Sequence, residues 1–298
     1  MDAMVLCAGL GTRLRPLTLE RPKALVPVLD RPLAAHALGV LAAAGVRRVV
    51  ANAFHLAGQV EPGLEPWARR HGLSLRVLVE PSLLGTGGGL RAALPHLGTG
   101  AFVVFNGDLL ASPDLSGALE HHRRTGARVT LVVREDPRAE RFGVLEVDRQ
   151  GRLRRLLGEG EAPREPLRRC LFTGVYVLDP SVAPWLPEEG CVVKHTLRAL
   201  LARGETVAAW VDQGPWRDLG TLSEYAQACF DLAGEVPRVA AGVEVPAGVA
   251  LGPGVVLGPG VTVRGRGALS RVVAWDGATV TAPLSDAVCT PERVVPLG

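Results

Sequence analysis

Apolar runs and helix-like segments alternate along residues 3–235. Short aliphatic or β-branched runs bounded by turn residues predict strands, and these are Ala3–Ala8, Val46–Ala51, Leu73–Glu80 and Ala101–Phe105. Segments of helical composition lie between them and include Arg31–Ala44, Glu61–His71 and a short helix starting in Leu90–Leu94. This order predicts an α/β fold with a Rossmann-like, mainly parallel mixed sheet and helices on both faces. Ligands bind such sheets at the carboxyl ends of the strands.

One further helix is predicted before Gly126. Ser112 and Pro113 have the residue types of an N-cap and a first helical position, and Gly126 is typical of a helix end. His121 and His122 lie near its C-terminal end beside two arginines. We interpret them as solvated cations favoured by the helix dipole rather than as metal ligands.

A different pattern follows Asp231. From Val243 the sequence repeats every six residues as VEVPAG, VALGPG, VVLGPG and VTVRGR, and aliphatic residues occupy the first and third places of each unit. This period predicts a β-helix of about three coils, each repeat supplying one short strand and one turn. We therefore expect two domains, residues 1–235 and a hexapeptide-repeat tail at residues 236–298.

Composition and charge restrict the compartment and the partners. The chain has 298 residues, of which 47% are hydrophobic, and its net charge of +3 is too small to indicate nucleic-acid binding. Five cysteines without C-x-x-C spacing are typical of thiols in a reducing compartment. There is no signal-peptide pattern and no apolar run long enough for a membrane span. We expect a cytoplasmic protein with no membrane partner.

The residues after the first strand predict a polyphosphate site. Gly9 and Gly11 allow a sharp turn and a close approach to a ligand. Arg13 and Lys23 follow, and loop N–H groups together with cations neutralise phosphate oxygens. An ordinary turn with solvated basic residues is the alternative for a lone Gly-x-Gly.

Other strand ends add glycines and carboxylates. Gly85–Gly89 (GTGGG) predicts a second glycine-rich turn, whose backbone could lie flat against a base or ribose. Asp108 follows the strand AFVVF directly, and Asp218 follows the apolar run VAAWV. Carboxylate oxygens are the ligands that Mg²⁺ prefers, so these two aspartates are candidates for one metal site. An Asx-turn is the alternative for Asp108.

Because of these glycine, cation and aspartate motifs, the chain resembles the sugar-1-phosphate nucleotidyltransferases, or NDP-sugar pyrophosphorylases. Their opening pattern G-x-G-T-R-[LM]-x-P-x-T is matched at Gly9–Thr18, and P-K-x-L-x-P at Pro22–Pro27; the Gly-Asp pair and the W-x-D-x-G-T motif are also present. The hexad tail is similar to the left-handed β-helix of mannose-1-phosphate guanylyltransferases. The resemblance implies an enzyme that joins an NTP to a sugar 1-phosphate and releases pyrophosphate with the help of Mg²⁺.

The resemblance also implies roles for individual residues. Arg13, Lys23 and Asp108 are the expected catalytic residues, and Asp108 and Asp218 the expected metal ligands. The expected nucleotide-binding residues are Leu10, Gly11, Thr12, Arg13, Lys23, Glu80, Gly85, Thr86 and Gly87. The expected sugar-phosphate-binding residues are Asn106, Gly143, Glu161, Gly174 and Lys194.

One motif departs from the family pattern. The family's Glu-Lys-Pro is matched here by Glu161-Ala162-Pro163, so the lysine that would contact the sugar phosphate is missing. A dianionic phosphate needs neutralising, and Lys194, Arg168 or Arg169 could supply the cation. Glu159 could replace Glu161 as the residue that contacts sugar hydroxyls.

The substrates and the reaction class leave alternatives. The opening motif and tail favour mannose 1-phosphate with GTP, and Glu80 would accept hydrogen bonds from a guanine edge. TGGG, NGD and the missing lysine favour uridylyl transfer to N-acetylmuramic acid 1-phosphate. A non-catalytic nucleotide-sugar sensor is an alternative, as is an acyltransferase, although the tail lacks a histidine base. The exposed end of a short β-helix needs covering, so we expect a homo-oligomer.

Overall fold

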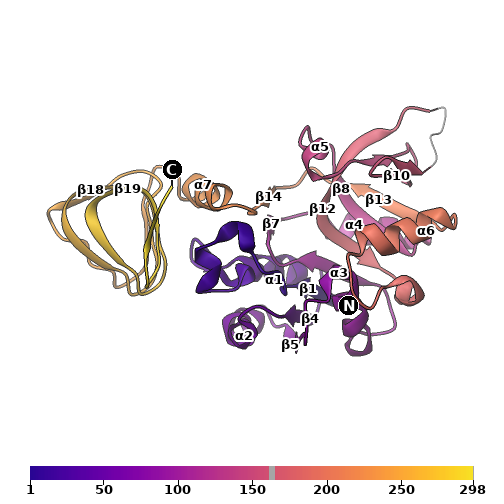
Figure 1. Cartoon of the computed structure of the whole chain (residues 1–298), viewed down its shortest axis with the longest axis horizontal. Helices are drawn as coiled ribbons and strands as arrows, with labels where there is room; N and C mark the ends of the chain where they lie inside the picture. Colours follow the sequence, from indigo (N-terminus) through magenta and orange to yellow (C-terminus); the bar gives the residue numbers. More distant parts are fainter. Residues whose placement is uncertain (161–164, 298) are drawn as a thin grey trace. The chain divides into compact units, whose positions relative to one another are not determined.

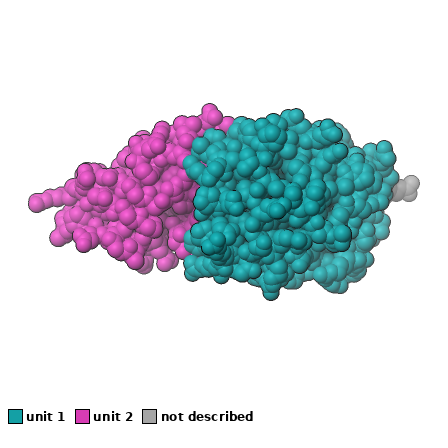
Figure 2. Space-filling view, turned by 90° about the horizontal axis from the view of Figure 1, so that it is seen from below, with its two compact units in different colours: residues 1–10, 34–216 teal, residues 11–33, 217–298 magenta. Residues whose placement is uncertain are grey.

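The computed structural model describes residues 1–160 and 165–297, and these residues form two compact units. Unit 1 contains residues 1–10 and 34–216, and unit 2 contains residues 11–33 and 217–298 (Figure 2). We call residues 11–33 the signature segment and residues 236–298 the tail. The signature segment is therefore grouped with the tail, although it follows the first strand in the sequence. The division into domains at residue 235 stays a prediction.

Unit 1 is built on a mixed sheet of ten strands with the order β11-β10-β9-β12-β6-β1-β4-β5, to which β8 and β13 are added through β12. Strands β6, β1, β4 and β5 are parallel neighbours, and β12 runs antiparallel to β6 and β8. The strands are β1 (Asp2–Leu6), β4 (Arg48–Ala53), β5 (Ser74–Val79), β6 (Phe102–Asn106), β8 (Val129–Arg134), β9 (Leu145–Val147), β10 (Leu153–Leu156), β11 (Glu159–Gly160), β12 (Arg168–Leu178) and β13 (Val207–Val211). The predicted sheet is confirmed.

The central strands form because their apolar residues are buried on both faces of the sheet. Met4, Val50 and Val104 are completely buried in one hydrophobic cluster on one face, and Val5 and Val103, on the other face, are also completely buried. Continuous apolar runs of this kind are typical of parallel strands that helices cover on both sides. Each predicted strand is present, with ends that differ by one or two residues.

Helices of unit 1 pack on this sheet, with α2 against β5, α3 against β1 and β4, and α4 against β8, β12 and β13 (Figure 1). The helix bounds are α1 (Leu33–Ala43), α2 (Val60–Arg70), α3 (Gly85–Ala93), α4 (Leu115–Thr125), α5 (Ala139–Phe142), α6 (Arg198–Ala202) and, in unit 2, α7 (Leu222–Ala233). Short turns of helix are η4 (Ala57–Gln59), η5 (Leu94–His96), η6 (Pro180–Trp185) and η7 (Val193–Leu197). Across residues 1–160 and 165–297, the structure contains no helix with the length and apolar character of a membrane span.

Helix α4 differs from its prediction at its start and at its histidines. Its N-cap is Asp114, whose carboxylate accepts a 2.9 Å hydrogen bond from the Gly117 N–H, so the helix does not begin at Ser112. Gly126 ends the helix in the left-handed conformation, as predicted. The interpretation of His121 and His122 as solvated cations is wrong, because both are more than 90% buried. They lie on the face of α4 that packs on the sheet.

Unit 2 contains the β-helix. Its strands are β15 (Arg238–Val239), β16 (Val249–Leu251), β17 (Val256–Leu257), β18 (Thr262–Ala274), β19 (Thr279–Cys289) and β20 (Val294–Pro296). All pairs but β19–β20 are parallel, and Val256 pairs with Val273 one coil later (Figure 1). Val255, Leu257, Val261 and Val263 fill the interior, which confirms the β-helix read from the two aliphatic places of each hexad.

The rest of unit 2 consists of the signature segment and α7. The signature segment forms η1 (Thr12–Leu14), η2 (Leu17–Leu19), η3 (Lys23–Leu25) and the small pair β2 (Pro27–Val28) and β3 (Arg31–Pro32). Pairing of Arg31–Pro32 with β2 explains why the helix predicted from Arg31 begins only at Leu33. β14 (Trp216–Asp218) leads from unit 1 into unit 2, and β7 (Leu109–Ala111) belongs to unit 1.

Candidate active site

The start of the signature segment requires glycine at position 11. Gly11 has a φ of +59°, and a Cβ there would lie 2.7 Å from Cγ2 of Thr18. The Thr18 hydroxyl donates a 2.9 Å hydrogen bond to the Gly11 carbonyl, which closes the loop on itself. This turn exposes Thr12 and Arg13 at η1, whereas Leu10 is half-buried at the end of the first stretch of unit 1. The predicted nucleotide-binding residues 11–13 thus lie on a constrained turn.

Three predicted site residues gather around Gly220 in unit 2. The ammonium of Lys23 lies 4.0 Å from Oδ1 of Asp218, although the lysine is only 6% exposed. A Cβ at Gly220 would lie 2.9 Å from Oδ2 of Asp218 and 3.0 Å from both terminal nitrogens of the Arg13 guanidinium. The W-x-D-x-G-T motif therefore places its carboxylate beside both Arg13 and Lys23, and its glycine leaves room for these side chains. Two cations and a carboxylate in one cluster are suited to a phosphate–metal ligand.

Asn52 connects three strand ends of unit 1. Its Oδ1 accepts a 2.8 Å hydrogen bond from the Cys7 N–H beyond β1, and its Nδ2 donates one of 2.6 Å to Oε1 of Glu80 beyond β5. The other oxygen of Glu80 accepts from the Leu84 N–H at 3.1 Å. Both residues are buried. Sequence reasoning missed Asn52. It could have been found as the polar residue near the carboxyl end of the otherwise apolar run VVANA.

The glycine-rich segment is helical, so its prediction as a turn is wrong. Helix α3 starts at Gly85, and Gly87, Gly88 and Gly89 are buried within it. A Cβ on Gly88 would lie 2.3 Å from the Glu188 carbonyl oxygen, and one on Gly89 would lie 2.8 Å from both Asn52 and Glu80. These glycines allow close packing of the helix, which outweighs the low helix propensity of glycine.

The first residues of α3 already have partners in the chain. The Gly87 N–H donates to the Gly190 carbonyl at 2.8 Å, and the Thr86 hydroxyl accepts from the Val192 N–H at 2.9 Å. Gly85 has a φ of +73° and approaches Gly190 so closely that a Cβ would lie 2.7 Å from its oxygen. The role of Gly85, Thr86 and Gly87 in nucleotide binding stays a prediction.

Asp108 lies at the carboxyl end of β6, as predicted. The preceding Gly107 donates a 2.9 Å hydrogen bond to the Leu6 carbonyl at the end of β1, and a Cβ there would lie 2.8 Å from the Cys7 sulfur. Burial, with the nearby Asp108 carboxylate, raises the pKa of the Cys7 thiol to about 12. Cys7 is therefore a neutral packing residue against the Gly107-Asp108 turn.

The two segments predicted to bind the sugar meet through Trp216. Its indole N–H donates a 2.8 Å hydrogen bond to the Thr173 carbonyl, and its ring makes an edge contact with Phe142, next to Gly143. The register of β12 against β8 shifts between Phe172 and Val175, so Gly174 lies in a bulge.

The bulge at Gly174 brings it against a second predicted residue. Gly174 has a φ of +83°, and a Cβ there would lie 2.8 Å from Nδ2 of Asn106. Gly143 also has a positive φ, of +97°. Asn106, Gly143 and Gly174 are thus parts of one region of unit 1. The W-x-D-x-G-T motif contains Trp216 but does not predict that this residue joins the two segments.

The candidates for the missing cation differ in their surroundings. Arg168 lies 3.6 Å from Glu135, and Arg169 lies 2.5 Å from Glu140, in exposed ion pairs. Lys194 is exposed on η7. Glu161 lies outside the described residues, and the alternative Glu159 pairs with Arg198 at the surface.

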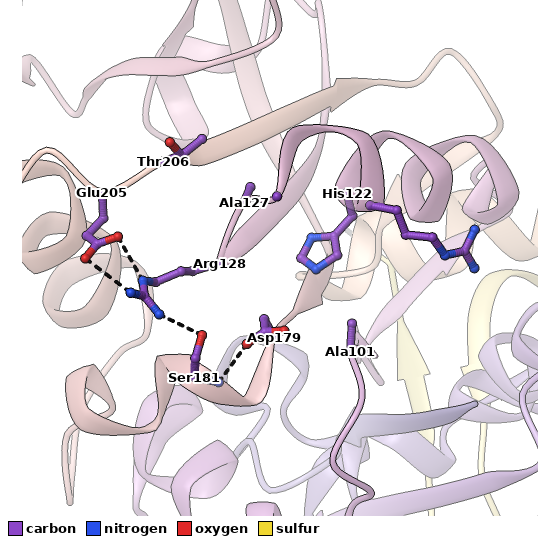
Figure 3. Close-up of a pocket in the computed structure, with 10 residues that line it drawn as sticks. Ala101, His122, Ala127, Arg128, Asp179, Ser181, Glu205 and Thr206 are labelled. Carbon is purple, nitrogen blue, oxygen red and sulfur yellow. Dashed lines mark hydrogen bonds and ion pairs between the residues drawn. The ribbon is translucent and has the colours of Figure 1, made fainter.

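The pocket in Figure 3 is a different feature of unit 1. It has a volume of about 470 Å³ and is lined by Ala101, Arg128 and Thr206, which directly precede β6, β8 and β13. Arg128 bonds Glu205 at 2.8 Å and the Ser181 hydroxyl at 2.7 Å (Figure 3). This pocket lies at the amino ends of the parallel strands, whereas α/β sheets bind ligands at the carboxyl ends. It is not the candidate active site.

The donor set fits magnesium bound together with a phosphate ligand. In the described part of the chain, no three His, Cys, Asp or Glu side chains gather as a metal site. Mg²⁺ is often held by one or two carboxylates, with substrate phosphates and water as further ligands. The pairing of Asp108 with Asp218 joins residues of the two units and stays a prediction.

Comparison with known proteins decides the family. A family model described as nucleotidyl transferase matches residues 2–234. The chain belongs to the nucleotidyl transferase family. This match includes the motifs that contain Arg13, Lys23, Asp108 and Asp218, and members of the family generally use a divalent metal.

Named relatives of this nucleotidyltransferase agree on the reaction class. A mannose-1-phosphate guanylyltransferase of Mycobacterium tuberculosis is 36% identical and aligns with 95% of this chain and 82% of its own length. A glucose-1-phosphate thymidylyltransferase of Streptomyces antibioticus is 30% identical over 82% of this chain and 70% of its own. The chain is an enzyme that transfers a nucleotidyl group to a sugar 1-phosphate, which confirms the reaction predicted from its motifs.

A solved structure supports the fold of the same region. HddC from Yersinia pseudotuberculosis has a TM-score of 0.64 and 21% identity, with 78% of this chain and 99% of HddC covered. At this identity the likeness concerns the fold alone. It confirms the α/β architecture of the nucleotidyltransferase.

Proposed function

We propose that this nucleotidyltransferase joins GTP and mannose 1-phosphate to give GDP-mannose and pyrophosphate. The observation that carries this proposal is the extent of the match to the M. tuberculosis mannose-1-phosphate guanylyltransferase, which covers 95% of the chain. Residues 1–235 alone are less than four fifths of the 298 residues, so the match includes much of the tail. The likeness thus extends beyond the catalytic motifs that all sugar nucleotidyltransferases share.

In this reaction an oxygen of the sugar phosphate attacks the α-phosphorus of the triphosphate. The bond between the α-phosphorus and the bridging oxygen breaks, and pyrophosphate leaves with that oxygen. Such a transfer depends on alignment and charge neutralisation, and it needs no side-chain nucleophile. Asp108 and Asp218 would hold Mg²⁺, which neutralises phosphate charge when it is bound.

Arg13 and Lys23 bind the triphosphate and stabilise the charge that grows on pyrophosphate. The near-complete burial of Lys23 strengthens its electrostatic interactions, because solvent screens them less. Asp218 holds the lysine ammonium at 4.0 Å. A preorganised cation of this kind acts on the transition state without reorganisation.

Glu80 is the residue that reads the base. A carboxylate only accepts hydrogen bonds, which suits the N1–H and N2–H₂ donors of guanine. Its oxygens already accept from Asn52 and from the Leu84 N–H, and each has a further acceptor site. These two contacts support the role by fixing the orientation of the carboxylate.

In this proposal the sugar phosphate is bound by Asn106, Gly143, Glu161, Gly174 and Lys194. Arg168 and Arg169 are each close to a glutamate, so Lys194 is the better candidate for the missing cation. Lys194→Ala is expected to raise KM for mannose 1-phosphate while KM for GTP stays unchanged. Arg168→Ala serves as the matched control, and equal KM values for both variants would refute the role of Lys194.

The function is tested by measuring pyrophosphate release with Mg²⁺. GTP, UTP, dTTP, ATP and CTP are each combined with mannose, glucose and N-acetylmuramic acid 1-phosphates, and Asp108→Ala is the inactive control. Release with GTP and mannose 1-phosphate alone is the expected result. Release with UTP and N-acetylmuramic acid 1-phosphate would establish the alternative branch. A folded protein that binds nucleotide but releases no pyrophosphate in any combination would be a sensor.

We also propose that the enzyme is a cytoplasmic homo-oligomer. All five cysteines are free thiols, which suits a reducing compartment. Val236 is 69% exposed, and Val239 of β15 and Val294 of β20 are at least 40% exposed, so unit 2 presents aliphatic side chains at its surface. Light scattering after size exclusion measures the mass, and a monomer of 31.4 kDa would refute the oligomer.

A further inference from the structure

An ion pair joins the signature segment to the tail two residues before Lys23. Arg21 bonds both carboxylate oxygens of Asp276, at 2.7 and 2.8 Å. Its guanidinium also lies 5.1 Å from the ring centroid of Trp275. The hydrogen bond from Arg21 is the main cause that lowers the pKa of Asp276. Bidentate geometry with a stacked ring fixes both the position and the orientation of the arginine.

A second ion pair lies one residue earlier. Oε1 of Glu20 accepts hydrogen bonds from the Thr290 hydroxyl at 2.8 Å and from Nε of Arg293 at 2.7 Å. The Glu20 side chain is only 7% exposed, so solvent screens this contact weakly. Two adjacent residues of the signature segment are thus held by separate parts of the tail.

The other flank of Lys23 is held through helix α7. The Tyr225 hydroxyl donates a 2.7 Å hydrogen bond to the Pro27 carbonyl and accepts one of 2.9 Å from the indole N–H of Trp275. Both rings are buried, and a buried polar pair with satisfied hydrogen bonds resists displacement. Trp275 therefore contributes to both flanks, through Arg21 and through Tyr225.

These contacts fix the backbone on both sides of Lys23, whose ammonium lies beside Asp218. A binding cation contributes most when surrounding residues hold it in its productive geometry. We propose that the β-helix tail is part of the triphosphate site, with Trp275, Asp276, Thr290 and Arg293 as positioning residues for Lys23. This inference rests on the proposed function, because it assigns Lys23 to the triphosphate.

Asp276→Asn tests the inference against a matched control in the same tail. Asp286→Asn removes a carboxylate that bonds Arg271, a residue of the tail, at 2.6 Å. Asp276→Glu keeps the charge and serves as the rescue variant. The measurements are hydrogen exchange of residues 11–33 by mass spectrometry, the Kd of Mg·GTP by calorimetry without sugar phosphate, the KM of each substrate, and Tm.

Asp276→Asn is expected to speed exchange in residues 11–33 and to raise the Kd of Mg·GTP by about fivefold. KM for the sugar phosphate and Tm should match those of Asp286→Asn, and Asp276→Glu should restore most of the GTP affinity. If the role of Asp276 were purely structural, Asp276→Asn would lower Tm without raising the Kd of Mg·GTP selectively over the KM for the sugar phosphate. If Asp276→Asn equals Asp286→Asn in exchange and in Kd, or alters exchange alone, the inference is overturned.

If Asp276→Asn lowers Tm much more than Asp286→Asn does, the variant Arg293→Gln is used in its place. Arg293→Gln removes the contact with Glu20, and the same criteria apply. A wild-type protein that neither binds GTP nor releases pyrophosphate from it overturns the proposed function. Exchange and Kd are then measured with the NTP from which the wild-type protein releases pyrophosphate, and equal values in Asp276→Asn and Asp286→Asn overturn the inference.

Discussion

Gly220 shows how one missing side chain can shape a charged site. An added Cβ would approach the Asp218 carboxylate and the Arg13 guanidinium at 2.9–3.0 Å. Gly220→Ala must therefore displace one of these groups, and displacement of a positioned group by about 1 Å can cost up to about a hundredfold in rate. We expect kcat/KM to fall by about tenfold or more with little change in Tm, measured by pyrophosphate release.

Gly100 provides the control for this substitution. No described atom beyond its chain neighbours lies within 4 Å of a Cβ at Gly100, and its φ is not in the left-handed region. Gly100→Ala should keep full activity. If Gly220→Ala is equally active, the close approach at Gly220 has no importance for the reaction.

Asn52 is required as an amide because it donates to one partner and accepts from another. Asn52→Asp keeps the bond from the Cys7 N–H but places a second carboxylate 2.6 Å from Glu80. We expect a loss of about 1–3 kcal/mol of unfolding free energy at pH 7.5, measured by urea unfolding. The two carboxylates repel each other only while both are charged, so this loss should shrink as the pH falls towards 5.

Asn52→Ala separates charge repulsion from a lost hydrogen bond. It removes the donor and the acceptor without adding a charge, so its destabilisation should be similar at pH 7.5 and pH 5. Equal losses at both pH values for Asn52→Asp would contradict a repulsion between residues 52 and 80.

At the scale of elements, α3 reverses the usual effect of glycine in a helix. Replacing glycine by alanine in an exposed helix interior stabilises it by about 1 kcal/mol. Gly88→Ala instead brings a Cβ to 2.3 Å from the Glu188 carbonyl oxygen, so we expect destabilisation of about 1–3 kcal/mol in urea unfolding. Gly58→Ala on η4 has space for its Cβ and should change stability by less than about 0.5 kcal/mol. A stabilised Gly88→Ala would refute the close packing.

The buried face of α4 makes stability depend on pH. Burial lowers the pKa of His121 and His122, with smaller contributions from Arg124 and Arg123 respectively, and His122 is 2.9 Å from the Thr130 hydroxyl. The unfolded chain binds protons at these histidines near pH 6.5. Their stabilising contribution is therefore complete above pH 6.5 and decreases as the pH falls through 6.5 towards the lower folded pKa.

Tm measured between pH 5 and pH 8 tests this pH dependence. The wild-type Tm should decrease below pH 6.5, and the double variant His121→Asn, His122→Asn should show a flatter profile. An unchanged slope in the double variant would assign the pH dependence to other groups.

Sequence patterns predicted elements best where burial is regular. The β-branched runs and the hexads mark positions buried on strands and coils, and those strands were found. Gly85–Gly89 and the α4 histidines were misread because tertiary packing outweighed local propensity. Arg13, Lys23 and Asp218 were each named from the family motifs, but their proximity around Gly220 was not predicted. Asn52 was missed because its partners are set by strand order, which a linear sequence does not show.

At the scale of the whole molecule, each compact unit is made of two segments that are separated in the sequence. This division predicts that the signature segment unfolds cooperatively with a distant part of the chain. The signature segment has its ion pairs with the tail and its tyrosine bond with α7, so it should open together with them. Native-state hydrogen exchange at increasing denaturant measures the opening free energy of each segment. Amides of residues 11–33 should share their opening free energy with β18 and β19, and both should differ from β1 and β4. If residues 11–33 instead exchange with β1, which directly precedes them in the chain, covalent proximity determines their stability and the tail does not.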